Sequence, residues 1–198
     1  MKGIIMYSHK TNQTKAQIID AFITILNTKD ISKITISDIT KEAKINRGTF
    51  YRHFDDKFDL INKKEDEILD QTKDILKKYL DDNVTSSSFN TYRTEVLSVL
   101  NNNSSFISAM IGENGDLTFE TKILTEMYTF SQNNIKYFGI VIDHPTIEQE
   151  ITLQFLTNGL LGVIKTWLQN TDISIEELSQ IIDDIIEKGI LNTISNSN

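Results

Sequence analysis

The stretch that decides the fold runs from Thr35 to Lys57 and reads TISDITKEAKINRGTFYRHFDDK. Its first part places Ile36, Ile39 and Ala43 on one face of a short helix, which Thr35 can cap. Its last part, RGTFYRHF, predicts a second short helix after a turn. Because two helices this short cannot form a stable core alone, a third helix must pack across them.

The third helix is predicted upstream, over residues 15–26. Ile19, Phe22 and Leu26 follow the spacing of a buried stripe on an amphipathic helix. The three segments together predict a helix-turn-helix unit, which we assign to residues 11–56 as a DNA-binding domain.

The second short helix has an unusual outer surface. If Phe50 and Phe54 point inward, the remaining side chains supply two guanidinium groups, hydroxyls and an imidazole, which bind phosphates and base edges. Gly48 removes a side chain where DNA would come closest. Lys57 and the free N–H groups at the start of the next helix could bind a phosphate. The outer side chains are Arg47, Thr49, Tyr51, Arg52 and His53.

These residues resemble the DNA-binding signature of TetR/AcrR-type transcriptional regulators over residues 11–60. The resemblance is carried by Thr35, the spacing of Ile36, Ile39 and Ala43, RGTFYRHF, and Lys57. It implies a dimer whose second short helices enter successive major grooves of a double-stranded DNA operator. It also implies a C-terminal domain that dimerises and usually senses a small ligand.

The resemblance assigns roles by position. The residues that would face bases are Arg47, Gly48 and Thr49, with Ser37 near them. The residues that would hold phosphates are Thr35, Tyr51, His53 and Lys57, and Arg52 could do either.

Two features limit the resemblance. Lys44 stands in the turn where family members commonly have Gly, and a left-handed conformation there would cost about 1 kcal/mol. Beyond residue 60 the likeness is loose: SSFISAMIGENGDLTF and NGLLGVIKTWLQN are similar to a Gram-positive branch that includes regulators of dihydroxyacetone kinase operons.

Composition favours helices throughout. The 198 residues include one Pro and eight Gly, too few for a turn-dense sandwich or barrel, and 39 % are hydrophobic, enough to bury a core. The net charge of −8 divides unevenly. Residues 1–60 hold ten Lys and Arg against seven Asp and Glu, and residues 61–198 hold ten against 21. This asymmetry suggests two roles in one chain.

The rest of the chain predicts further helices and no strand. We expect an all-α protein of about nine helices, with residues 57–198 as a C-terminal dimerisation and ligand-binding domain. GENGD reads as a turn, Pro145 is expected in a first helical turn after Asp143 as a cap, and the tail NTISNSN is expected to fray. The expected helices cover about 57–80, 92–100, 118–137, 145–170 and 174–190.

The C-terminal apolar helices leave two interpretations open. Gly159 and Gly162 permit either close helix approach at a dimer seam or room for a ligand; we favour the seam, with two helices per subunit in a four-helix bundle. Its predicted residues are Gly159, Gly162, Trp167, Ile181 and Ile185. As a group, the predicted ligand-pocket residues are Tyr92, Arg93, Phe106, Met110, Met127, Tyr128, Phe155 and Asn158, although each apolar one is more often core.

Other function classes find little support. The absence of Cys and the wide separation of the three His leave little from which to build a metal site, so we expect no metal and no cofactor. No nucleophile–base arrangement or phosphate-binding Gly loop suggests an enzyme. No apolar run approaches the ~18 residues of a membrane span, so we expect no membrane contact and a cytoplasmic protein.

We therefore expect a dimeric, sequence-specific transcriptional regulator, a repressor released by a small-molecule effector. The alternative is an adaptor of the same fold whose C-terminal half binds a partner protein and senses no small molecule.

Overall fold

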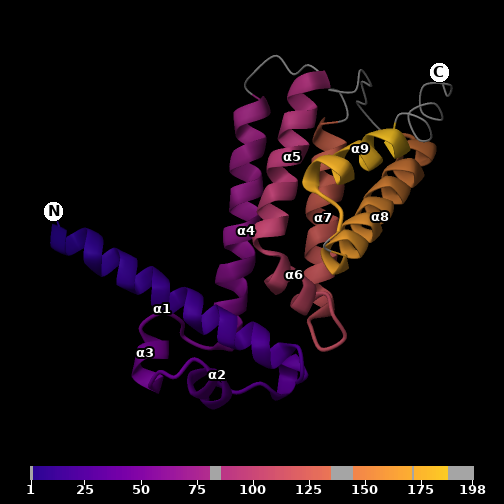
Figure 1. Cartoon of the computed structure of the whole chain (residues 1–198). Coiled ribbons are helices and arrows are strands. Elements are labelled where there is room, and N and C mark those ends of the chain that lie inside the picture. The colour runs from indigo at the N-terminus through magenta and orange to yellow at the C-terminus, as the bar shows by residue number, and fades with distance from the viewer. Residues whose placement is uncertain (1, 81–85, 135–144, 171, 187–198) are drawn as a thin grey trace. The chain divides into compact units, whose positions relative to one another are not determined.

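The computed structural model describes residues 2–80, 86–134, 145–170 and 172–186 (Figure 1). Over these residues every regular element is helical, which confirms the all-α prediction. The chain divides into two compact units. The first unit runs up to Asp70 and includes Ser105–Leu117, and the second comprises Gln71–Ser104 and the described residues from Thr118 onward. The functional boundary expected between residues 56 and 57 stays a prediction.

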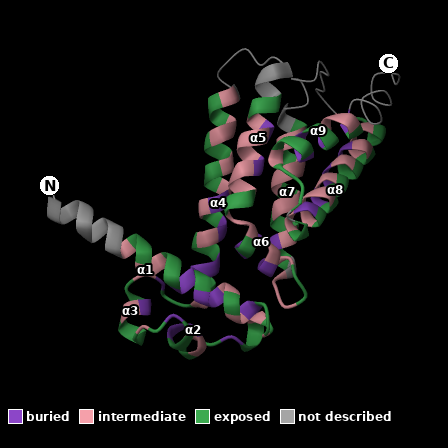
Figure 2. Ribbon diagram, in the orientation of Figure 1, coloured by how far each residue is buried: buried purple, intermediate pink, exposed green. Residues whose placement is uncertain are grey.

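The first unit holds the predicted helix-turn-helix. Helix α1 packs against α2, and α2 packs against α3. Figure 2 shows buried residues on α1 and α2. Phe22, Phe50, Phe54 and Leu60 are almost fully buried, so α1, α3, the turn after α3 and the start of α4 each bury a large apolar side chain within the first unit. The elements are α1 (Lys2–Leu26), the 3-10 helix η1 (Ile31–Lys33), α2 (Ile36–Glu42), α3 (Arg47–Tyr51) and the first part of α4 (Lys57–Leu80).

Side-chain caps fix where these short helices begin. Thr35 and Asp38 form a reciprocal capping box at α2, and Asn46 accepts a hydrogen bond from the Thr49 N–H at α3. Asp56 accepts from the backbone N–H groups of residues 58 and 59 at the start of α4. Each cap satisfies N–H groups that have no partner within the helix.

The turn between α2 and α3 contains the departure expected from the sequence. Lys44 has φ of 52°, the left-handed region that favours glycine. The backbone N–H of Ile45 still donates to Thr40 at 3.0 Å, so the turn keeps its hydrogen bonds despite the strained residue.

A segment from later in the chain belongs to the first unit. Helix α6 (Ser104–Met110) buries Phe106 and Met110, and the turn after it reaches back, with Ile31 N–H donating to Asn114 O at 3.0 Å. Gly115 is required there because a Cβ atom would collide with the Met110 carbonyl.

The second unit is a helical bundle around a separate core. It contains the end of α4, α5 (Ser86–Asn102), α7 (Leu117–Asn134), α8 (Ile147–Gln169) and α9 (Ile175–Ile185). Trp167 is buried among Leu97, Leu178 and Ile182, and its indole N–H donates to the Ile173 carbonyl at 2.9 Å. The Ser174–Glu177 capping box expected for the last helix is present.

Several predicted boundaries were wrong. Helix α1 begins at Lys2 because nothing in the segment before residue 15 stops it. Helix α3 ends at Tyr51 rather than near Phe54, since the chain turns at Arg52. Helix α8 is capped by Thr146, whose hydroxyl accepts from the Gln149 N–H, so Pro145 precedes the cap. The predicted cap at Asp143, the ends of the helices expected over 118–137 and 174–190, and the tail lie outside the described residues.

Candidate nucleic-acid interface

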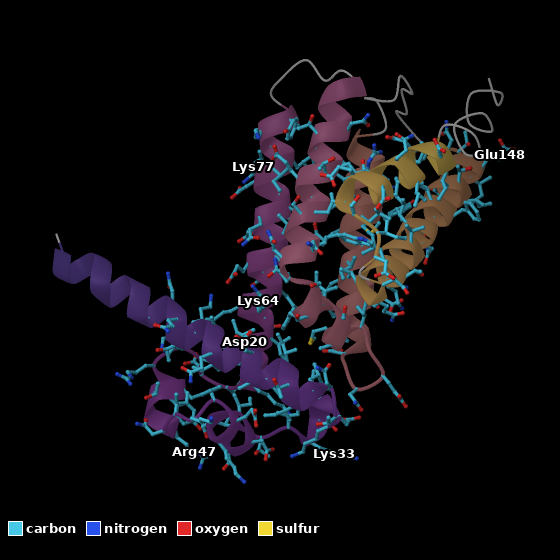
Figure 3. All side chains as sticks on the ribbon, in the orientation of Figure 1. Asp20, Lys33, Arg47, Lys64, Lys77 and Glu148 are labelled. Carbon is cyan, nitrogen blue, oxygen red and sulfur yellow. The ribbon has the colours of Figure 1, made fainter. Side chains whose placement is uncertain are left out.

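Helix α3 and the turn that follows it, up to Phe54, divide their side chains as the sequence predicts. Phe50 and Phe54 are 0 % and 1 % exposed, whereas Tyr51 is 49 % exposed. Figure 3 shows Arg47 on the outer side of this region. The outer residues, named the α3 face from here on, are exposed or half-buried: Arg47, Gly48, Thr49, Tyr51, Arg52 and His53.

Hydrogen bonds organise part of the α3 face. The Thr49 hydroxyl donates to Asn46 Oδ1 at 3.1 Å and accepts from Arg52 Nη2 at 2.8 Å. The hydroxyl therefore donates once and accepts once within the α3 face. The bond to Thr49 also holds the Arg52 guanidinium over the start of the helix, where a phosphate or base edge could reach its other N–H groups.

His53 is half-buried beside the α3 face. Burial, then the charges of Arg52 and Lys15, lower the pKa of its imidazole below the usual 6.5. The neutral ring predominates near pH 7 and offers one N–H donor, enough for one phosphate oxygen.

Thr35 and Ser37, on the α2 side, are both exposed. The Thr35 hydroxyl donates to Asp38 Oδ2 at 2.8 Å and accepts from the Asp38 N–H, so its first role is the capping box. Lys29 Nζ lies 2.7 Å from the Asp38 carboxylate. The bond from Lys29, then those from Thr35, lowers the pKa of Asp38 to about 2.

Lys57 has a role that the sequence did not predict. Its ammonium donates to the carbonyls of Ile31, Ser32 and Ile34 at 2.8, 3.1 and 2.9 Å. These bonds use all three of its hydrogens and tie η1 to the start of α4. No sequence signal could reveal this, because the acceptors are backbone oxygens far along the chain. Its phosphate contact stays a prediction, and a phosphate would have to share those hydrogens.

The residues predicted to line a ligand pocket belong to both units of the chain. Phe106 and Met110 are buried in the first unit, and the other six belong to the second. There, Phe155 and Asn158 are exposed on α8. Met127 and Tyr128, on α7, are half-buried.

Arg93 and Tyr92 lie inside the second unit instead. The Arg93 guanidinium donates to Ser179 at 2.9 Å and to Asp183 at 2.5 Å, so it joins α5 to α9. The Tyr92 ring stacks on Phe130 and meets Tyr79 edge-on. Burial raises the pKa of the Tyr92 hydroxyl well above its usual value.

The residues predicted for the dimer interface differ in how far they are exposed. Gly159 and Gly162 are exposed, and a Cβ atom on either would meet nothing within 4 Å. Ile181 and Ile185 on α9 are 43 % and 42 % exposed. Trp167 differs: it is 6 % exposed, and the core of its own chain leaves little of it for a partner.

A hollow of about 330 Å³ opens on the surface of α7 and α8. An ion pair between Lys165 and Glu120, at 2.9 Å, lies at its lining. Within the part of the chain that the structure describes, no group of His, Asp and Glu could hold a metal ion, and no helix is long and apolar enough to cross a membrane. The lining residues are Glu120, Asn158, Leu161, Gly162, Lys165, Thr166 and Gln169.

Family models match both parts of the chain. The model for bacterial regulatory proteins of the tetR family matches residues 18–63, and one described as a transcriptional regulator C-terminal region matches residues 87–188. An HTH-type regulator of Bacillus subtilis, YxbF, is 25 % identical over 181 residues. The match covers 88 % of this chain and 45 % of YxbF, so the chain spans less than half of that relative.

Solved structures share the fold. The dihydroxyacetone kinase operon activator DhaS is 19 % identical with a TM-score of 0.57, covering 90 % of this chain and 97 % of DhaS. FadR of Bacillus subtilis, in complex with stearoyl-CoA, is 18 % identical with a TM-score of 0.61, covering 88 % of this chain and 98 % of FadR. With the helix-turn-helix geometry and both family matches, the chain belongs to the TetR family of DNA-binding transcriptional regulators.

Proposed function

We propose that the chain works as a homodimer that binds an operator through the α3 face of each copy and represses transcription until a small molecule in the second unit releases it. The observation that carries the DNA-binding part is the division of α3 and the turn after it, where Phe50 and Phe54 are buried and guanidinium and hydroxyl groups form the outer surface. Repression is the simplest consequence of occupying a promoter.

On DNA, the residues of the α3 face would divide their work. Arg47, at the first position of α3, is placed to reach base edges. Tyr51, His53 and Arg52 would hold the phosphates beside it, and Gly48 lets the backbone come close. Two copies of this face must stand about 34–36 Å apart to read one turn of B-DNA, so a dimer is part of the mechanism.

The second unit supports the dimer through exposed apolar side chains. Ile147, Ile151 and Phe155 on α8 are 68 %, 62 % and 69 % exposed, and Ile181 and Ile185 on α9 are exposed as well. Large aliphatic and aromatic groups gathered on neighbouring helices are typical of an interface. We assign this surface to the second copy.

Release by a ligand would act on the spacing of the two α3 faces. Helix α4 contributes to both units, so a ligand that favours another tilt of α4 would change that spacing. The ligand shifts the balance only by its differential affinity for the two states. FadR holds stearoyl-CoA within the same fold, which supports a ligand role for the second unit of this chain.

One observation favours the adaptor alternative. Tyr79, Tyr92 and Phe130 pack their rings together in the second unit, and Arg93 is already bonded to Asp183. Tyr92 and Arg93, both predicted to line a ligand pocket, are thus already engaged in contacts within the chain. An adaptor would use a surface such as the hollow on α7 and α8 for a partner protein.

The DNA-binding part is tested with the promoter region of the gene for this chain, at two salt concentrations. Wild type should form a sequence-preferring complex that weakens as salt rises. Tyr51→Ala should weaken binding to all sequences, and Arg47→Ala should cost about 1–3 kcal/mol at one base position and blur base preference there. The absence of any sequence-preferring complex at low salt would refute the proposal.

The ligand and adaptor alternatives are separated by native mass spectrometry of the purified protein, with added stearoyl-CoA as the probe. A bound small molecule whose addition dissociates the operator complex supports release by ligand. If no co-purified or added small molecule changes operator binding, and the chain forms a stable complex with a second protein, the result supports the adaptor.

A further inference from the structure

The two arginines of the α3 face are held differently. Among the described residues Arg47 has no hydrogen-bond or ion-pair partner, so nothing in the chain fixes the direction of its guanidinium. Arg52 follows directly after α3, and its Nη2 donates to the Thr49 hydroxyl at 2.8 Å. This bond draws the Arg52 guanidinium back toward the first turn of the helix. Of the two guanidinium groups, only that of Arg52 is therefore positioned before DNA arrives.

Asn46 fixes the hydroxyl group that holds Arg52. Its side-chain Oδ1 accepts from the Thr49 N–H at 2.8 Å and from the Thr49 hydroxyl at 3.1 Å. The hydroxyl hydrogen is thereby used, and a lone pair of the same oxygen accepts from Arg52. Since threonine is branched at Cβ, its side chain has few rotamers, and these bonds select one of them. We call Asn46, Thr49 and Arg52 the α3 relay.

Gly48 leaves room for the first member of the α3 relay. A Cβ atom at this position would lie 3.3 Å from Asn46 Oδ1, closer than ordinary van der Waals contact. A larger residue would therefore press on the oxygen atom that accepts both bonds from Thr49. The missing side chain of Gly48 thus protects the relay at its first atom.

The Arg52 guanidinium keeps donors for another partner. A guanidinium has five N–H groups in one plane, and the bond to Thr49 uses one of them. Whichever hydrogen of Nη2 makes that bond, one edge of the group retains two parallel N–H donors. Arg52 is exposed, and no carboxylate of the described residues pairs with it, so these two donors are open to DNA.

The place of these two donors favours a base over a phosphate. Position in the chain alone groups Arg52 with Tyr51 and His53, which would hold phosphates. In helix-turn-helix proteins, however, the first residues of the reading helix meet base edges, and the α3 relay brings the guanidinium back to that turn.

We propose that Arg52 reads a guanine in each half-site of the operator, with Thr49 and Asn46 as positioning residues. Guanine is the base whose major-groove edge offers two acceptors, O6 and N7, to two parallel donors. Adenine and cytosine present a donor on that edge, and thymine presents one acceptor beside its methyl group. The inference rests on the proposed DNA binding and adds the base that is read and the residues that position its reader.

The base preference of the full chain tests the role of Arg52. Wild type and variants select from a pool of randomised duplexes at one salt concentration. Arg52→Ala should lower the preference for one guanine per half-site about tenfold and keep the preferences at the other positions. Uniform weakening across all sequences would mean that Arg52 holds a phosphate, and it would overturn the assignment. A wild type that selects no sequence would overturn the proposed DNA binding as well.

A modified duplex tests which atom is read. The base 7-deazaguanine, placed at the selected position, replaces N7 by carbon and leaves base pairing intact. Wild type should bind this duplex roughly fivefold more weakly than the guanine duplex, because one of two acceptors is lost. Arg52→Ala should bind both duplexes equally. Equal binding by wild type, or the same loss in Arg52→Ala, would mean that Arg52 does not read this base.

Substitutions at Thr49 test the α3 relay. Thr49→Val keeps the branched shape and the N–H bond to Asn46 but removes the hydroxyl, so the same guanine preference should fall roughly threefold. Thr49→Ser returns the hydroxyl and should restore most of that preference. In the Arg52→Ala background, Thr49→Val should cause no further loss at this position. An additive loss, or a preference in Thr49→Val equal to that of wild type, would overturn the relay.

Two controls separate positioning from folding. Thr125→Val removes an exposed hydroxyl on α7 that bonds only a carbonyl of its own helix, and it should leave the selected sequence unchanged. Because the bond from Arg52 to Thr49 is exposed, Thr49→Val should hardly change the free energy of unfolding in urea. A variant that loses stability and weakens every sequence alike would mean that Thr49 is structural, and it would overturn the positioning role.

Discussion

The α3 face and the side of α8 that carries Ile147, Ile151 and Phe155 are both exposed, but they expose opposite chemistry. On α3 and the turn after it, cationic and hydroxyl groups are exposed while Phe50 and Phe54 are buried. On α8, Ile147, Ile151 and Phe155 point outward beside a polar hollow. Apolar groups left in water cost free energy, whereas exposed cations cost almost nothing. The difference supports the proposal that the two surfaces meet different partners, a polyanion at α3 and a protein surface at α8.

The charges of the chain follow the same division. Residues 1–60 hold three more basic than acidic residues, and residues 61–198 hold eleven more acidic than basic ones. Basic side chains gather where phosphates would be met, and the acidic remainder would be repelled by DNA. The variants below test whether the two regions are as separate as their surfaces suggest.

The largest change in the free energy of unfolding is expected from a substitution within α3. Phe50→Ala should lower the free energy of unfolding by about 3–5 kcal/mol, because Phe50 is fully buried in the first unit. Its neighbour Tyr51→Ala should leave unfolding nearly unchanged and weaken DNA binding. Urea denaturation and operator titration measure the two quantities. Equal stability loss in both variants would mean that the α3 face is not separate from the core.

A buried cation in the second unit provides the contrast to the exposed cations of the first. Asp183→Asn removes the carboxylate that Arg93 contacts, and Arg93 has only 9 % of its side chain exposed. The loss should be somewhat below the about 3–5 kcal/mol of a fully buried pair, because Asp183 keeps contact with water. Urea denaturation measures this loss in the free energy of unfolding. A variant as stable as wild type would mean that the contact with Asp183 contributes little to stability and that the bonds from Arg93 to Ser179 and Asn90 suffice to hold it.

Lys57 is half-buried, so its exposure is intermediate between that of the exposed cations on the α3 face and that of the buried Arg93. Lys57→Met should lower the free energy of unfolding by about 1–3 kcal/mol, since three carbonyls lose a charged donor. The salt dependence of operator binding then separates its two roles. A slope reduced by about 1 relative to wild type would reveal the predicted phosphate contact, and an unchanged slope would leave only the structural role.

The smallest effect concerns Asp38, whose pKa of about 2 lies below the unfolded value near 3.8. A lowered pKa adds stability that is present above pH 4 and is lost as the pH falls toward 2. The stability difference between wild type and Asp38→Asn should therefore shrink as the pH falls. Thr35→Val removes the same capping box without removing the carboxylate and serves as the control. A difference independent of pH would contradict the ion pair with Lys29.

Hydrophobic periodicity and capping residues in the sequence predicted most of the fold. The stripe in α1, the caps at Thr35, Asn46 and Ser174, and the inward Phe50 and Phe54 were all predictable, because each depends on neighbours within a few residues. Their separation along the chain sets the helix face directly. The strained turn at Lys44 was predicted from the family resemblance and is present.

Long-range contacts could not be predicted. The three carbonyl bonds of Lys57, the burial of Arg93 against Asp183 and the packing of Trp167 depend on which helices meet, and no local spacing encodes that. The ligand-pocket residues were chosen for their type alone, so they scatter over two units. Which outer residues touch DNA stays a prediction that the binding measurements decide.

The hydrogen bond from the Ile31 N–H to the Asn114 carbonyl bears on where the chain can be truncated. Because Ser105–Leu117 completes the first unit, a fragment ending after α4 would lack Phe106 and Met110 and expose the apolar surface that they cover. A DNA-binding fragment cannot be excised from this chain at a single peptide bond. Insertions or tags placed in the turn around Gly115, more than eighty residues downstream of η1, would disturb the packing of the first unit, which carries the helix-turn-helix.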